Sequence, residues 1–154
     1  KAHAKPAPDM ADVPVSLKAV KPYIERAAEL QAKDPIVAHH CRMWALEEAM
    51  RLRAAGNIPK EDMGFVIGLM DMLEKEKGVL GELDNPSVLV ENFAQDLFQR
   101  ADDADRGGQY DKRTAKAFLV ASQLIDVCKQ FGELPEDLKE KAKYAKWRFV
   151  EIAK

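Results

Sequence analysis

The sequence contains few of the residues that usually build a reactive or membrane-spanning site. Its 154 residues include two cysteines and three histidines, and no HExxH, GxSxG or glycine-rich phosphate loop occurs among them. No apolar run approaches the roughly 20 residues that a helix needs to cross a bilayer. The initial KAHAKPAPDM lacks the apolar stretch of a signal peptide. We therefore expect a cytoplasmic protein that does not insert directly into membranes.

The net charge limits the classes of partner, and the cysteine spacing indicates the redox compartment. The chain has 24 basic and 26 acidic side chains and a formal net charge of −2. Nucleic acids and anionic lipids attract proteins through a strong basic excess or a basic patch, so we expect no nucleic-acid partner. The two cysteines, Cys41 and Cys128, form no CxxC pair. This pattern is typical of free thiols in a reducing compartment.

Helix-forming residues are abundant, and proline and glycine divide them into segments. Asp34 and Asn85 each precede a proline and are favourable N-cap residues. Prolines placed to occupy the first position of a helix lie at 35, 59, 86 and 135. Glycines placed to end a helix lie at 56, 78, 81, 107, 108 and 132. The segments between them predict six helices and no strand, over residues 22–33, 35–54, 60–77, 86–105, 110–131 and 135–153.

The six expected helices fall into two groups of three. We therefore predict an all-α fold of two tandem three-helix bundles, with room for an extra short helix. The first unit is expected over residues 17–82 and the second over residues 83–154. Residues 1–16 are expected to be a disordered tail or a foreign leader ahead of the native chain. The helix over residues 110–131 is apolar nearly all round, which predicts a central place in the second unit.

Two histidines and a cysteine adjoin one another in DPIVAHHCR, residues 34–42, and raise the question of a metal or a nucleophile. A helix turns about 100° per residue, so His39, His40 and Cys41 point in three directions and cannot converge on one ion. Cys41 is in phase with an apolar stripe and is expected to be a small buried hydrophobe. We therefore predict no catalytic residue and no metal site here.

The acidic run ADDADR, residues 101–106, raises the question of calcium. Counted from Asp102, Gly107 occupies the sixth position of an EF-hand loop, but Arg113 occupies the twelfth, where the loop needs a glutamate. A solvated helix end leading into a turn is the better interpretation. We expect no cofactor.

The second and third helices each carry two apolar faces. One face of the second holds His39, Met43, Leu46 and Met50, nearly opposite the stripe that contains Cys41. Either both faces are core, or one is left open as a groove edged by methionines. Such a groove suits an amphipathic helix, because methionine side chains adapt to varied partners.

The last helix carries a third feature. Lys139, Lys143 and Lys146 line one face, and Trp147 projects away from the expected core. A row of lysines beside an exposed aromatic favours an acidic peptide as partner. A solvated face is the alternative for the lysines alone.

Four strings carry a family resemblance: DPIVAHHCRMWALEEAM, ADDADRGGQYDKRTAKAF, FGELP and KYAKWR. In this order and spacing the chain resembles the N-terminal domain of the Vta and LYST-interacting-protein family, cofactors of the Vps-four ATPase in the ESCRT pathway. The resemblance covers residues 17–154. It implies two MIT modules in tandem and a non-enzymatic adaptor that binds the tails of ESCRT-III subunits, the charged multivesicular body proteins.

The resemblance also implies where the protein works. In the family, a C-terminal region dimerises and stimulates the ATPase, and we expect this chain to end before it. The expected location is the cytoplasm, with recruitment to endosomal membranes. The alternative is a structural helical scaffold with no peptide-binding groove.

Site residues carry over from the resemblance only in part. In the first unit the candidates lie between the second and third helices: Met43, Leu46, Met50, Phe65, Leu69 and Met72, with Glu47 and Glu76 to pair with basic residues of the guest. In the second unit they are Tyr110, Lys143 and Trp147. Where family members can carry Tyr-Tyr, this chain has His39 and His40, so the family's detailed contacts near His39 are not carried over, and a weak pH sensitivity near neutral pH is expected.

Overall fold

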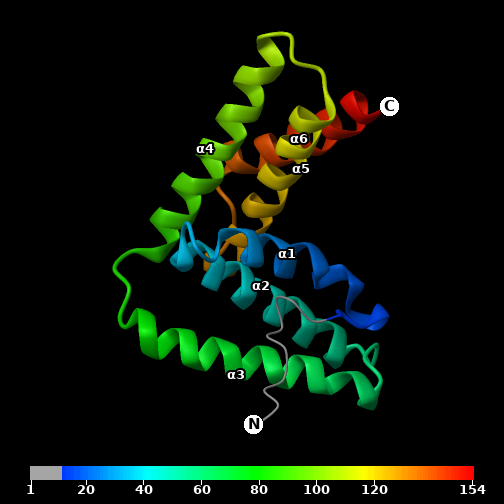
Figure 1. Ribbon diagram of the computed structural model, residues 1–154, viewed down its shortest axis with the longest axis vertical. Coiled ribbons are helices and arrows are strands. Elements are labelled where there is room, and N and C mark those ends of the chain that lie inside the picture. Colours follow the sequence, from blue (N-terminus) through cyan, green and yellow to red (C-terminus); the bar gives the residue numbers. More distant parts are fainter. Residues whose placement is uncertain (1–11) are drawn as a thin grey trace. The chain divides into compact units, whose positions relative to one another are not determined.

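The computed structural model describes residues 12–154 as helices joined by short turns (Figure 1). Six α-helices and three 3-10 helices make up the regular structure of these residues, and no strand occurs among them. The predicted all-α fold is confirmed. None of the helices in this range is long and apolar enough to cross a membrane.

The described part of the chain divides into two compact units, with the boundary between Asp84 and Asn85. The first unit contains η1 (Val15–Val20), α1 (Lys21–Leu30), α2 (Pro35–Ala54), η2 (Lys60–Asp62) and α3 (Met63–Leu80). The second contains α4 (Pro86–Arg106), α5 (Lys112–Val127), η3 (Cys128–Phe131) and α6 (Glu136–Ala153). The predicted tail over residues 1–16 lies outside the described residues up to position 11. Val15 and Ser16 already belong to η1, so the fold begins earlier than predicted.

The prolines lie at the starts of helices, close to the places predicted, but the residues that cap these helices differ from the prediction. Asp34 caps α2 as expected, because its side chain accepts a hydrogen bond from the Val37 amide at 3.2 Å. Asn85 does not cap α4: its backbone is left-handed, with φ of 51°, and its side chain makes no capping bond. An N-cap normally has an extended backbone. Pro59 and Pro135 occupy the N-cap position, whereas they were predicted to occupy the first position inside a helix.

The third helix ends three residues later than predicted. Gly78 lies inside α3, and the chain leaves the helix only at Gly81, which has φ of 69° and donates its amide to the Lys77 carbonyl at 3.0 Å. A positive φ costs glycine little, because it has no Cβ to clash with the backbone. The fifth helix begins later than predicted. Tyr110 lies in the turn before it, and α5 starts after Asp111.

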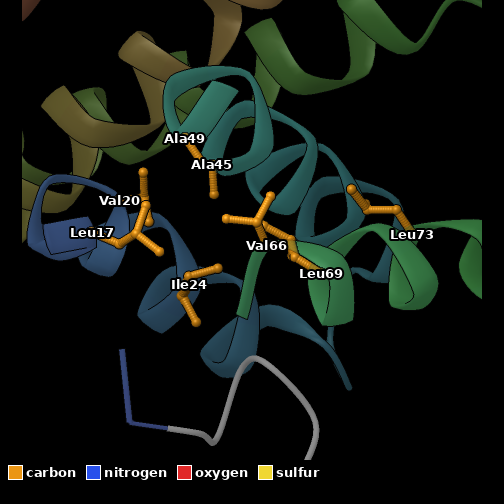
Figure 2. Packing of buried hydrophobic residues seen from close by; sticks show 8 residues of the cluster. All are labelled: Leu17, Val20, Ile24, Ala45, Ala49, Val66, Leu69 and Leu73. Atoms are coloured by element: carbon orange, nitrogen blue, oxygen red, sulfur yellow. The ribbon is translucent and has the colours of Figure 1, made fainter. Parts of the chain in front are cut away.

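The first unit is held together by one apolar cluster, drawn in Figure 2. Its members come from η1, α1, α2 and α3, and each is at most 8% exposed. They are Leu17, Val20, Ile24, Ala45, Ala49, Val66, Leu69 and Leu73. Burial of such side chains is the main favourable contribution to folding. The same cluster brings α2 and α3 together.

The second unit is built around α5, which packs against both α4 and α6. Its core cluster contains Phe98, Ala101, Phe118, Ala121 and Ala145. The Phe98 and Phe118 rings meet edge to face with centroids 6.1 Å apart, a favourable arrangement for aromatic pairs. The central position predicted for this helix is confirmed.

Candidate functional site

An open groove lies between α2 and α3 in the first unit. Its volume is about 1150 Å³, slightly above the usual range for small-molecule sites in proteins. Helix α2 contributes His39, His40, Met43, Leu46 and Glu47. Helix α3 and the residues after it contribute Met70, Leu73, Glu74, Lys77, Gly78, Leu80, Gly81, Glu82 and Leu83.

The groove combines apolar side chains with an acidic rim. Its carboxylates are Glu47, Glu74 and Glu82, and Lys77 is the one lysine among the lining residues. Met43 is 36% exposed at the edge of the groove. An apolar channel with a negative rim can accommodate the apolar face of an amphipathic helix whose flanking residues are basic.

A polar network links His39, which lines the groove, to Glu76 of α3. His39 Nδ1 donates to Glu76 Oε1 at 2.8 Å, and Arg42 Nη1 donates to Glu76 Oε2 at 2.6 Å. Arg42 Nη1 also donates to Gln31 Oε1 at 2.6 Å. The Arg42 side chain is fully buried and that of Glu76 is 14% exposed. The network therefore ties the end of α1 to α2 and α3, and commits Glu76 to internal contacts.

The neighbouring histidine has a different environment. His40 Nδ1 donates to the Ile36 carbonyl at 2.8 Å. Burial lowers the pKa of His40 below its usual value, and this effect outweighs the hydrogen bond to Ile36, which raises the pKa. Cys41 is fully buried beside it, as predicted. Within residues 12–154, no group of three or more His, Cys, Asp or Glu side chains is placed to hold a metal ion.

The predicted first-unit residues separate into three sets. Met43, Leu46 and Glu47 line the groove. Met50 and Phe65 pack against the core cluster, and Leu69 is a fully buried member of it. Met72 and Glu76 line a second, smaller cavity of about 320 Å³. Leu69 has no exposed surface and therefore belongs to the core.

Sequence reasoning missed much of the groove. Met70 and Leu73 line the groove, although neither was among the predicted site residues. Glu74 and Lys77 lie one and two turns beyond Met70 on α3, so a helical wheel centred on Met70 would have found them. The contribution of residues 81–83 carries no periodic signal, because these residues follow the end of the helix.

The predicted second-unit residues lie on an exposed aromatic surface. Tyr110 is 65% and Trp147 is 53% exposed. The Arg148 guanidinium lies 5.6 Å from the Tyr110 ring and 6.0 Å from the Trp147 ring. Asp105 of α4 accepts from Arg148 Nε at 2.7 Å and from Nη2 at 2.8 Å. This paired hydrogen bond fixes the guanidinium between the two rings.

The lysines of α6 are not equivalent. Lys139 pairs with Glu133 at 3.0 Å, and Lys146 lies 3.6 Å from Asp126. Lys143 is exposed and makes no hydrogen bond or ion pair with any described residue. It is therefore the lysine of this row that is available to an acidic partner.

Comparison with known proteins places the chain in a family. Residues 19–154 match the family model described as Vta1 like. The chain belongs to this family. The resemblance drawn from the sequence is thus confirmed.

Named relatives of this Vta1-like chain come from plants, animals and amoebae. The Arabidopsis thaliana protein named homolog of mammalian LYST-interacting protein 5 is 37% identical over 89% of this chain and 32% of its own length. The human vacuolar protein sorting-associated protein VTA1 homolog is 35% identical, over 91% of this chain and 47% of its own length. The Dictyostelium discoideum vacuolar protein sorting-associated protein VTA1 homolog is 31% identical, over 94% of this chain and 27% of its own length. The Vta1-like chain spans less than half of each of these relatives.

Proposed function

We propose that this Vta1-like chain is a non-enzymatic adaptor domain in vacuolar and multivesicular body protein sorting. Relatives named for vacuolar protein sorting support this general role. The proposal is that the chain binds the C-terminal tails of ESCRT-III subunits, with each compact unit acting as an MIT-like module. The observation that carries it is the open, apolar, acidic-rimmed groove between α2 and α3.

The mechanism in the first unit is helix-in-groove recognition. Leucines of the guest helix bury apolar surface against Met43 and Leu46, while basic side chains of the guest approach the rim carboxylates. Rim charges chiefly speed association, and apolar burial supplies most of the affinity. The expected affinity is micromolar, about −8 kcal/mol.

The second unit is proposed to hold an acidic guest. Exposed Trp147 and Tyr110 offer aromatic surface, and unpaired Lys143 offers positive charge beside Trp147 on the same face of α6. Aromatic and arginine side chains are the commonest anchors in protein interfaces. An acidic segment fits this surface better than it fits the negative rim of the first unit.

The adaptor is further proposed to link ESCRT-III filaments to the Vps-four ATPase. The ATPase contact is proposed to lie in a C-terminal region, since this chain covers less than half of its relatives. Recruitment from the cytoplasm to endosomal membranes would then follow from binding the filaments.

The decisive experiment fills the groove without disturbing the core. Gly78 lines the groove, and a Cβ added there would meet no atom within 4 Å. Gly64 is equally open, belongs to the same helix and lies outside the groove. We would titrate Gly78→Trp, Gly64→Trp and the wild type against fluorescein-labelled C-terminal tails of the ESCRT-III subunits.

We expect the wild type to bind some of the tails. Gly78→Trp should weaken this binding at least about tenfold, and Gly64→Trp should leave it unchanged. Circular dichroism of both variants checks that the helices remain folded. Flat titrations across all tails would refute the proposal and leave a structural helical scaffold. Equal losses in both variants would show that the groove is not the site.

A further inference from the structure

The groove of the first unit has a wall that belongs to neither helix. After the last turn of α3, the chain continues through Gly81, Glu82 and Leu83, and all three line the groove. We name residues 81–83 the connecting segment, because α4 of the second unit begins at Pro86. We infer that the connecting segment touches the guest directly and helps to select it.

The conformation of the connecting segment is defined by its first residue. Gly81 has φ of 69° and donates to the Lys77 carbonyl at 3.0 Å, which ends the helix and redirects the chain. Leu83 then lies at the groove, where it is half-buried although it belongs to no helix. Its remaining exposed surface is available to an apolar side chain of a guest.

Charge identifies the kind of guest. Glu82 is exposed on the connecting segment and adds a carboxylate to those of Glu47 on α2 and Glu74 on α3. The rim is therefore negative on all three elements, and Lys77 is the one lysine that opposes it. The partner that fits is an amphipathic helix with leucines on one face and lysine or arginine beside them.

This inference rests on the proposed function and adds a selectivity determinant to it. A three-helix unit that ended with α3 would offer the same groove without the contacts from Glu82 and Leu83. Guests that differ only in the residues facing the connecting segment should then bind this chain with different affinities. This difference in affinity would come from the connecting segment and not from the three-helix bundle itself.

The test uses the whole chain and two matched pairs of variants. Leu83→Ser removes the apolar contact, and Leu89→Ser is its control, since Leu89 is 44% exposed on α4 and lies outside the groove. Glu82→Lys reverses the charge, and Glu61→Lys is its control, since Glu61 is exposed in η2 before the start of α3. The probe is the fluorescein-labelled ESCRT-III tail that binds the wild type most tightly.

We expect Leu83→Ser to weaken binding by about five- to tenfold, through loss of apolar contact. Glu82→Lys should weaken it by about three- to fivefold at low salt, and less at high salt because added ions screen exposed charges. Both controls should stay within about twofold of wild type. Amide hydrogen exchange should show protection of the connecting segment when the tail is bound.

Two negative results are distinguishable. If Leu83→Ser and Glu82→Lys bind like the wild type while Gly78→Trp has lost binding, the groove holds the guest and the connecting segment does not contact it. If the wild type binds no tail, the proposed function fails and this inference fails with it. Circular dichroism of Leu83→Ser guards against unfolding, and Glu82→Lys changes only an exposed side chain.

Discussion

The strongest mutational prediction concerns the carboxylate of Glu76, which is only partly exposed. Replacing it with alanine leaves the fully buried Arg42 without its carboxylate partner and removes the acceptor for His39. Loss of one partner of a buried ion pair costs about 3–5 kcal/mol, because the remaining charge stays buried. The Glu76 side chain is 14% exposed, so water can partly reach the site. We therefore expect about 3 kcal/mol of lost stability in the first unit.

The unit offers its own probe for this measurement. Each unit contains one tryptophan, and Trp44 of the first unit is 5% exposed. In a Trp147→Phe background, Trp44 fluorescence reports unfolding of the first unit alone. A loss of about 3 kcal/mol corresponds to a fall in melting temperature of about 12 °C or more for a unit of this size.

The control is Glu74→Ala, which removes an exposed carboxylate two positions away on the same helix. It should change stability by less than about 0.5 kcal/mol. The double variant Arg42→Met, Glu76→Leu should be more stable than Glu76→Ala alone, because the buried arginine charge is then removed together with its carboxylate. If Glu76→Ala proves as harmless as Glu74→Ala, the network does not hold the helices together.

Three further predictions concern individual side chains. Since burial lowers the pKa of His40, the unfolded chain takes up a proton on this side chain more readily than the folded chain, so the free energy of unfolding should fall as pH drops below about 6.5. Measured by urea titration from about pH 7.5 to 5.5, the free energy of unfolding should depend less on pH in His40→Gln than in the wild type. An equally steep pH dependence in the two proteins would contradict this. Burial raises the pKa of the Cys128 thiol to about 12, so N-ethylmaleimide should label it slowly in the native protein and rapidly in urea; fast native labelling would show that it is accessible. Asp34→Ala should lose about 1 kcal/mol by thermal denaturation through the missing N-cap of α2, with Asp34→Asn close to wild type; equal loss in both would show that the cap bond is unimportant.

Local signals were sufficient for much of the fold. Helix α2 runs from Pro35 to Ala54 as predicted, because the cap, the proline and the helix-forming run all lie within a few residues of one another. The central place of α5 also followed from sequence, since a helix that is apolar nearly all round needs neighbours on several sides. The cap predicted at Asn85 was wrong: its backbone is left-handed, a conformation that an N-cap residue does not normally adopt, and its side chain makes no capping bond.

The sequence by itself determined which residues share a helix face, since helical periodicity depends only on spacing along the chain. Only the tertiary structure decided which face is covered: Leu46 borders the groove and Leu69 is fully buried, although both were candidates for the same surface. It also decided that Arg42 lies fully buried against Glu76, 34 positions away. Such contacts arise from the packing of whole helices, and neither partner carries a local signal of the other.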